Sequence, residues 1–410
     1  MWDKILDRML RDLFSHGALQ LTYPDGTKRH YGPAAEPTAR MVMHDPDLPK
    51  RMVLSTELTL GEGYMDGTLT IENDDLDAFF ELILHNTGGK GRNVWWRKWS
   101  RRAKVLRRRI DQNNPMYKAR QNVAHHYDLS PALYDLFLDA DRQYSCAYFR
   151  DPDMTLEQAQ AAKKHHIAKK LLLERDMEVL DIGCGWGGMA LTLARDYGAK
   201  VLGVTLSEEQ HKYATDRAEA EGLSDRVRFE LRDYRKVTET FDRIVSVGMF
   251  EHVGVPHYGE FFDHVSQRMK PDGITLLHTI GRAGPPSATS RWIAKYIFPG
   301  GYIPALSEVA PVIEHSGLHM TDLEVWRLHY AETLKHWSDR FIAREDEARA
   351  LYDDRFCRMW RYYLKAAEHT FRSGKQCVFH LQLSHKQDAV PLTRDYLYPA
   401  GEASTRQAAE

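Results

Sequence analysis

A glycine-rich turn follows an apolar segment near the middle of the chain. Residues 179–182 read Val-Leu-Asp-Ile, and residues 183–188 read Gly-Cys-Gly-Trp-Gly-Gly. Glycines let a ligand approach the backbone closely, and the helix expected after them presents free N–H groups. A GxGxG motif alone also fits NAD, but the Asp-Ile-Gly-Cys-Gly lead-in followed by Trp-Gly is more typical of S-adenosylmethionine sites. No Lys-Ser/Thr pair follows, which counts against a P-loop.

The segments after the next two predicted strands supply the other polar groups of such a site. Many nucleotide-binding folds carry an acid at the end of the second strand to hold a ribose. Residues 204–210 instead read Val-Thr-Leu-Ser-Glu-Glu-Gln, so Thr205 and Gln210 are expected to supply hydrogen bonds. The third strand is expected to end at Asp233-Tyr234, where an acid can meet the adenine amino group.

Three further positions carry groups able to do chemistry, and each also has a plain structural interpretation. His278, at a strand end, could be a core histidine whose ring nitrogens are hydrogen-bonded within the protein. Glu251 could belong to an ordinary helix N-terminus, and Cys146 could be a small buried apolar side chain. The four cysteines form no CxxC pair and no cluster with histidine, which is typical of reduced thiols. The histidine pairs 125–126 and 165–166 lack a third ligand at suitable spacing, so no metal site is expected.

From residue 177 onward, strand and helix patterns alternate, and this alternation predicts a mostly parallel sheet with helices on both faces. Two later strands flank a helical insertion. The expected strands are Glu178–Gly183, Lys200–Leu206, Val227–Asp233, Phe241–Gly248, Gly273–Ile280, His319–Trp326 and Cys377–Ser384.

Residues 1–89 predict a smaller α+β domain. Ile5, Met9 and Leu13 mark an amphipathic helix, and residues 18–23 alternate as a strand does. Residues 74–84 predict a second helix with one apolar face. The chain length of 410 residues suits two or three such domains.

The remaining segments complete the expected organisation. Residues 111–176 are expected to be helical, and Thr155 with Gln158 forms a capping box before the last helix. The catalytic domain is expected over residues 116–395, with a polar tail over 396–410.

Residues 90–115 are interpreted as a basic, tryptophan-rich linker or helix. Ten basic residues and three tryptophans fall between positions 90 and 110 with no acid among them, although the net charge of the chain is only −2. This composition suits an anionic membrane surface. A solvated linker remains an alternative, and nucleic acid binding is the weakest of the three.

Several motifs together resemble the cyclopropane-fatty-acid synthase family, which includes the mycolic acid cyclopropane synthases. The resemblance extends from about Gly61 to Ser384, and the first motif with the extra N-terminal domain is similar to the bacterial phospholipid-acting branch. The motifs are residues 61–67, 126–129, 143–149, 179–188, 203–206, 245–254, 277–281 and 295–299.

The resemblance implies a class I S-adenosylmethionine methyltransferase fold, Rossmann-like, with a mostly parallel seven-stranded sheet. It also implies a bicarbonate bound beside the reacting methyl group, held by the backbone of Cys146 and Ile280 and the side chains of Glu251, His278 and Tyr330. The implied S-adenosylmethionine set is Tyr144, Ser145, Gly183, Gly185, Trp186, Gly187, Thr205, Leu206, Gln210, Asp233 and Tyr234.

The implied reaction transfers a methylene group to the cis double bond of a membrane phospholipid acyl chain. A carbocation forms and is deprotonated as the ring closes, so the site must supply a base and hold the reactants in a dry slot. The rings of Tyr144, Tyr148 or Phe250 are expected to stabilise the cation.

Three alternatives stay open from the sequence. A related lipid enzyme would release a methyl-branched or methylene product, a soluble enzyme would methylate a small amine, and an inactive relative would only bind lipid. No signal peptide and no apolar stretch of bilayer length are found. We therefore expect a cytoplasmic protein at the inner membrane face, and the resemblance suggests a homodimer.

Overall fold

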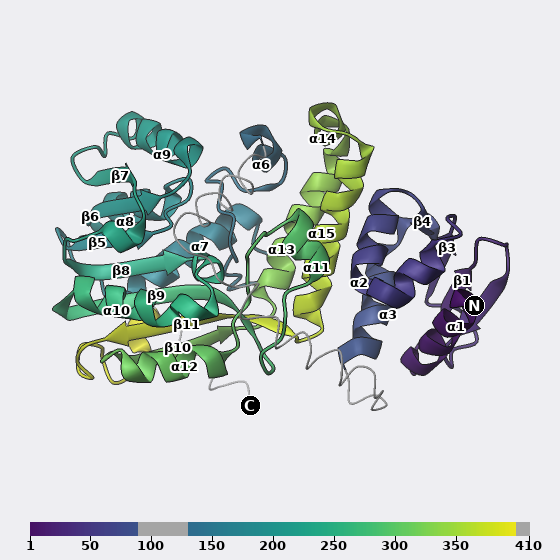
Figure 1. The fold of residues 1–410 in the computed structure, drawn as a ribbon. Coiled ribbons are helices and arrows are strands. Elements are labelled where there is room, and N and C mark those ends of the chain that lie inside the picture. Colours follow the sequence, from purple (N-terminus) through teal and green to yellow (C-terminus); the bar gives the residue numbers. More distant parts are fainter. Residues whose placement is uncertain (89–129, 399–410) are drawn as a thin grey trace, which may run out of the picture.

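The protein contains two β-sheets joined by a layer of helices (Figure 1). The computed structural model describes residues 1–88 and 130–398. The basic stretch 90–115, the 126–129 motif and most of the polar tail, from 399 on, lie outside these residues. Within the described residues, no helix is both long and apolar enough to cross a bilayer.

The N-terminal elements form a four-stranded sheet of order β2-β1-β3-β4 with helices packed on it. β1 pairs antiparallel with β2, with Leu19 opposite Tyr31, and parallel with β3. The turn between β1 and β2 is closed by Asp25, whose Oδ1 accepts the Thr27 N–H at 2.9 Å. The elements are α1 (Trp2–Leu13), β1 (Leu19–Thr22), β2 (Lys28–Tyr31), β3 (Ala39–Met43), α2 (Leu48–Met65), β4 (Leu69–Ile71) and α3 (Leu76–Gly88).

The expected first helix is confirmed, but the expected buried face is wrong. Leu6, Leu10 and Phe14 are buried, whereas Ile5 is 39% exposed. Both sets repeat every fourth residue, so helical periodicity alone does not separate them. The stripe that faces α2 is the one that loses contact with water.

The second sheet has seven strands in the order β10-β11-β9-β8-β5-β6-β7, as expected. The pairs from β9 to β7 are parallel, and β11 pairs antiparallel with both β9 and β10. Every expected strand is present with ends shifted by a few residues at most. The strands are β5 (Glu178–Ile182), β6 (Lys200–Thr205), β7 (Val227–Leu231), β8 (Phe241–Val247), β9 (Met269–Arg282), β10 (His319–Trp326) and β11 (Gln376–Ser384).

Helices α13 and α15 stand between the seven-stranded sheet and the N-terminal elements (Figure 1). Both belong to the expected insertion between β10 and β11. The helices of this half are α6 (Pro131–Phe137), α7 (Leu156–Lys170), α8 (Gly188–Tyr197), α9 (Glu208–Ala220), α10 (Tyr258–Arg268), α11 (Arg291–Tyr296), α12 (Leu306–His315), α13 (His329–Ala343), α14 (Glu345–Leu351) and α15 (Asp354–Arg372).

The region before β5 is less helical than expected. Between α6 and α7, residues 138–155 are irregular, and this loop carries the 143–149 motif. Its irregular backbone leaves side chains and carbonyls free to face a ligand. The expected capping box at the start of α7 is confirmed, with Thr155 and Gln158 each bonded to the other's backbone.

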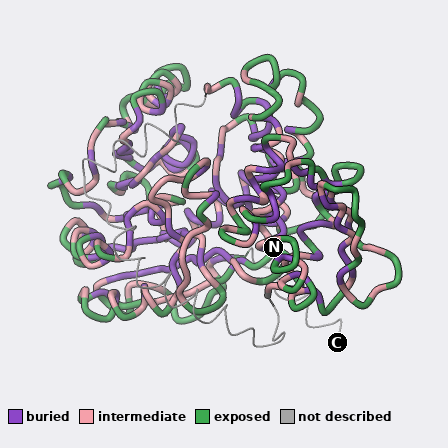
Figure 2. The backbone as a smooth tube through the Cα atoms, turned by 45° about the vertical axis from the view of Figure 1, so that its right-hand side comes forward, coloured by how far each residue is buried: buried purple, intermediate pink, exposed green. Residues whose placement is uncertain are grey.

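One apolar core runs from the N-terminal sheet through α15 to the loop before α7. Buried stretches continue through both halves, and exposed loops lie at the rim (Figure 2). Where α2 meets α11, Gly61 lies against the Trp292 indole, and Glu62 accepts hydrogen bonds from Lys295 at 2.7 Å and the Tyr296 hydroxyl at 2.9 Å. The N-terminal half therefore contacts the segment that follows β9.

Candidate active site

A cavity of about 290 Å³ opens at the carboxyl ends of β5, β6, β8 and β9. This is the edge at which α/β sheets place their ligands. The glycine-rich turn forms part of its wall, and the N–H groups of Gly183 and Cys184 bond the Val204 carbonyl of β6 at 3.0 and 3.1 Å. Gly183 has φ +78°, and a Cβ there would meet Met249 at 2.9 Å. The turn therefore requires glycine for both backbone and packing reasons.

Ten of the eleven side chains or backbone segments expected around the cofactor line this cavity. The exception is Gly187, which lies behind the wall, where a Cβ would meet Ala214 and Phe229 at 2.8 Å. Its role is close packing of the turn on α9. The lining residues of the set are Tyr144, Ser145, Gly183, Gly185, Trp186, Thr205, Leu206, Gln210, Asp233 and Tyr234.

The polar groups after β6 and β7 already have partners within the protein. Thr205 Oγ1 donates to Gln210 Oε1 at 3.0 Å. The Asp233 carboxylate accepts two hydrogen bonds from the Arg235 guanidinium, at 2.7 and 2.9 Å, and one from the Arg235 backbone N–H at 3.0 Å. An adenine amino group would therefore have to share Asp233 with Arg235.

Asp181 is a site residue that the sequence reasoning missed. It lies on β5 and lines the cavity, and its Oδ2 is buried without a hydrogen-bond partner in the part of the chain that the structure describes. Burial raises the pKa of this carboxyl to about 7. A buried acceptor without a partner favours a cationic ligand group. The available signal was an acid two residues before the first glycine, inside an otherwise apolar strand.

Glu251 lies in a short 3₁₀ turn, Phe250–His252, directly after β8. Its Oε1 accepts the Ile280 backbone N–H at 2.6 Å, whereas its Oε2 is buried without a hydrogen-bond partner among the described residues. Burial raises the pKa of Glu251 to about 7, although the Ile280 hydrogen bond opposes the shift. One carboxyl oxygen therefore remains for a ligand, and the Ile280 N–H is already used.

His278 and Tyr330 line the same cavity as Glu251. His278 Nδ1 lies 2.7 Å from His380 Nε2, and burial holds the pKa of His278 well below its usual range. Burial likewise raises the pKa of the Tyr330 hydroxyl. Both side chains are therefore neutral near pH 7.

Cys146 is fully buried and does not line the cavity, unlike the two residues before it. Its thiol donates to the Ala147 carbonyl at 3.3 Å, and burial raises its pKa. A protonated thiol is a poor nucleophile. A role for the sulfur is therefore disfavoured, and the expected backbone contact of Cys146 with the anion stays a prediction, since the cavity lining does not include this residue.

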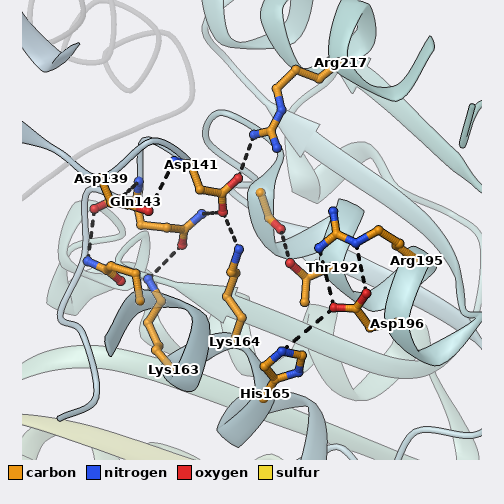
Figure 3. Close-up of polar contacts among 12 residues, drawn as sticks. Asp139, Asp141, Gln143, Lys163, Lys164, His165, Thr192, Arg195, Asp196 and Arg217 are labelled. Atoms are coloured by element: carbon orange, nitrogen blue, oxygen red, sulfur yellow. Dashed lines mark hydrogen bonds and ion pairs between the residues drawn. The ribbon is translucent and has the colours of Figure 1, made fainter. Parts of the chain in front are cut away.

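A buried lysine that the sequence reasoning missed holds the loop before α7. Lys163 Nζ donates to Gln143 Oε1 at 2.8 Å and to Ser145 Oγ at 2.7 Å. Figure 3 shows the Lys163–Gln143 contact beside a second one, in which Lys164 reaches the Asp141 carboxylate at 2.5 Å. Burial lowers the pKa of Lys163 to about 7. These contacts position the Tyr144–Ser145 segment against the cavity.

The aromatic predictions divide between wall and core. Tyr144 lines the cavity, whereas Tyr148 stacks on His166 and Phe250 stacks on Tyr258, and neither reaches the wall. Phe298 and Tyr302 line the cavity as well, and Trp292 is buried against α2. Only some of these rings are placed to contact a substrate.

His166 lies in a group that sequence spacing did not reveal. One ring nitrogen each from His166 and His380 and a carboxylate oxygen of Glu324 lie within 4.8 Å of one another. The Lys170 ammonium lies 2.5 Å from that carboxylate, so a positive charge already neutralises it. His165 faces away from this group, toward the Tyr197 hydroxyl at 3.0 Å.

Known proteins resemble this chain over most of its length. A family model described as mycolic acid cyclopropane synthetase matches residues 115–381, and one described as a domain of unknown function matches residues 5–90. The chain is 42% identical over 329 residues to cyclopropane-fatty-acyl-phospholipid synthase of Escherichia coli K12, covering 80% of this chain and 83% of the relative. It is 36% identical over 372 residues to a probable fatty acid methyltransferase of Pseudomonas putida, covering 88% and 90%.

A crystal structure of the mycolic acid cyclopropane synthase CmaA1, complexed with SAH and CTAB, is also similar. It superposes with a TM-score of 0.61 at 34% identity, covering 64% of this chain and 97% of that one.

Proposed function

This chain belongs to the mycolic acid cyclopropane synthetase family and is an S-adenosylmethionine-dependent methyltransferase, and from this premise we propose its reaction. It transfers a methylene group to the cis double bond of an unsaturated phospholipid acyl chain and closes a cyclopropane ring. The observation that carries the proposal is the buried Oε2 of Glu251, which has no hydrogen-bond partner within residues 1–88 and 130–398 and lies in one cavity with His278 and Tyr330.

The cavity wall fits S-adenosylmethionine by its donor set. Asp181 Oδ2, which has no hydrogen-bond partner among the described residues, suits the cationic amino group, and Thr205 and Gln210 suit ribose hydroxyls. When bound, this cofactor supplies the methyl group. The chain's own contribution is to hold the acceptor double bond against it and to exclude water.

The residues around Glu251 fit a small bound anion such as bicarbonate, which would supply a base. Burial raises the pKa of Glu251 to about 7, so near neutral pH its Oε2 can donate a hydrogen bond to the anion when protonated and take up a proton from it when ionised. The neutral His278 and Tyr330 can donate as well. An orienting set of three uncharged donors avoids placing a second negative charge beside the anion.

We place the substrate in a membrane and the basic stretch 90–110 at the surface of its anionic lipids. Vesicles containing an anionic phospholipid test this placement by sedimentation. Neutralising Arg101, Arg102, Arg107 and Arg108 should weaken binding more at low salt than at high salt. Equal sedimentation of the variant and the wild type would refute this placement.

The central experiment incubates the protein with S-adenosylmethionine and vesicles of cis-monounsaturated phospholipid. Lipids are then extracted for mass spectrometry and proton NMR. A gain of CH₂ with high-field ring signals supports cyclopropanation. A complete absence of modified lipid, with cofactor binding intact, would refute a phospholipid substrate.

A second product class has support from the Pseudomonas putida relative, a probable fatty acid methyltransferase. Such an enzyme would methylate the same double bond and release a methylene or methyl-branched chain. Vinylidene signals, or a gain of CH₂ plus two hydrogens, would identify it in the same assay.

A further inference from the structure

The segment between β9 and α12, residues 283–305, forms one wall of the cavity. The residues of this segment that line the cavity are Thr289, Ile293, Phe298, Gly301, Tyr302 and Ile303. Near the end of the segment the wall is fixed locally, because Tyr302 donates its backbone N–H to the Glu251 carbonyl at 2.8 Å. Its helix, α11, has only six residues, which is too short to be stable without contacts to other elements. The position of α11 must therefore come from elsewhere in the fold.

Glu62 of α2 supplies the polar part of that contact. Its Oε1 accepts hydrogen bonds from Lys295 Nζ at 2.7 Å and from the Tyr296 hydroxyl at 2.9 Å. Its Oε2 accepts one from the Arg51 guanidinium at 3.2 Å. Both carboxylate oxygens are used, and the side chain is only 15% exposed. A partly buried carboxylate with charged donors is held more strongly than an exposed ion pair.

A buried aromatic contact adds to this attachment. The Trp292 indole of α11 lies on Gly61, where a Cβ would meet the ring at 2.3 Å, and its Nε1–H donates to Met65 Sδ at 3.2 Å. The same ring meets the Tyr362 ring of α15 edge-on, with centroids 4.9 Å apart. The next residue, Ile293, lines the cavity. Helix α11 therefore has α2 on one side and the cavity on another.

We propose that the N-terminal domain shapes the slot for the acyl chain, with Glu62 holding α11 and, through it, Ile293 and Phe298 in the cavity wall. This inference rests on the proposed function, in which the cavity receives an unsaturated acyl chain. Glu62 itself does not line the cavity, so it is a positioning residue. Residues 5–90, which match a domain of unknown function, thereby take part in substrate selection.

The wall decides which double bond can react. Methyl transfer requires the double bond to lie at the reacting methyl group, and a misplacement of about 1 Å can lower a rate about a hundredfold. An apolar pocket distinguishes chains that differ by one methylene by roughly 10–200-fold. Ile293 and Phe298 limit how far an acyl chain can pass. A displaced α11 would therefore admit chains whose double bond lies at other positions.

The kinetic test compares Glu62→Ala with the wild type and uses Asp77→Asn as the matched control. The Asp77 carboxylate also joins the N-terminal half to the catalytic half, but its two donors, Lys365 and His369 at 2.8 Å each, lie on α15 and not on α11. Vesicles hold a mixture of phospholipids that differ only in the position of the cis double bond. Because these substrates compete for the same enzyme, the product ratio does not depend on how much of a variant is folded.

We expect the wild type to prefer one double-bond position by roughly tenfold or more, and Glu62→Ala to reduce this preference to within about threefold. Asp77→Asn should keep the wild-type preference. Lys295→Met removes one donor to Glu62 from a side chain that is 55% exposed, so it should fold even if Glu62→Ala does not, and it should shift the preference in the same direction. An unchanged preference in the folded Glu62 and Lys295 variants, an equal change in Asp77→Asn, or a wild type without preference would overturn the inference.

Amide hydrogen exchange tests the positioning step without substrate or cofactor. In Glu62→Ala the amides of residues 289–303 should exchange faster by roughly tenfold or more, because hydrogen bonds to a charged group are lost. Asp77→Asn should leave their exchange unchanged, and equal exchange in the wild type and Glu62→Ala would overturn the inference. Wild-type protein that modifies no phospholipid would refute the proposed function and the role in acyl-chain selection, and the exchange result would still decide whether Glu62 holds the wall.

Discussion

Replacement of Glu251 by glutamine should make the protein more stable at alkaline pH while removing its activity. The amide oxygen of Glu251→Gln can still accept the Ile280 N–H, so the 2.6 Å contact is retained. The variant loses only the ability to bind and release a proton at the position of Glu251 Oε2. We expect ring formation to fall by roughly 10²–10⁴, the range typical of lost acid–base groups.

The stability change follows from the raised pKa. Burial raises the pKa of Glu251 from its ordinary 4.5 to about 7, so the folded state binds its proton more tightly than the unfolded state. Stability therefore falls as pH rises from about 4.5 to about 7 and stays low above it. At about 1.4 kcal/mol per tenfold change in proton affinity, the full effect is roughly 3 kcal/mol.

Thermal unfolding of wild type and variant at pH 5 and pH 8 measures this effect. The advantage of Glu251→Gln should be larger at pH 8, and taking the difference between the two proteins removes the contribution of other acids such as Asp181. S-adenosylmethionine affinity should stay unchanged. A variant with the wild-type pH dependence and full activity would refute the reasoning on both counts.

Three further changes test the packing and the loop. Burial lowers the pKa of Lys163 from 10.5 to about 7 in the folded state, so between pH 7 and about 10 the unfolded state binds one more proton and the wild type gains stability as pH rises. Lys163→Met should abolish this gain, which thermal melting across that pH range measures. Cys146→Ala should retain activity within about tenfold, because the buried thiol is protonated; initial rates check this. Gly61→Ala should lower the free energy of unfolding by about 1–3 kcal/mol, since its Cβ would lie 2.3 Å from the Trp292 ring. The control Gly259→Ala, whose Cβ would meet nothing within 4 Å, should leave that free energy nearly unchanged, and urea unfolding measures both.

Local patterns predicted most of the sheet. β10 was predicted with the bounds that the structure has, and β5 to β8 within two residues, because these strands alternate with helices and are flanked by turn residues. The capping box at Thr155 also depends on residues three apart, so it was readable from the chain. The conformation of the loop between α6 and α7 could not be predicted from the chain, because distant groups such as Lys163 hold it in place.

The sequence by itself determined the family, the fold class and the residues gathered around the cofactor turn, because those motifs lie in short contiguous segments. Only the tertiary structure decided which atoms remain available for a ligand. Among the residues that the structure describes, Asp181 Oδ2 and Glu251 Oε2 have no hydrogen-bond partner, while the Ile280 N–H and the Asp233 carboxylate are engaged. The physical reason is that burial and hydrogen-bond partners come from segments far apart in the chain, as strand pairing brings His380 to His278 across 102 positions.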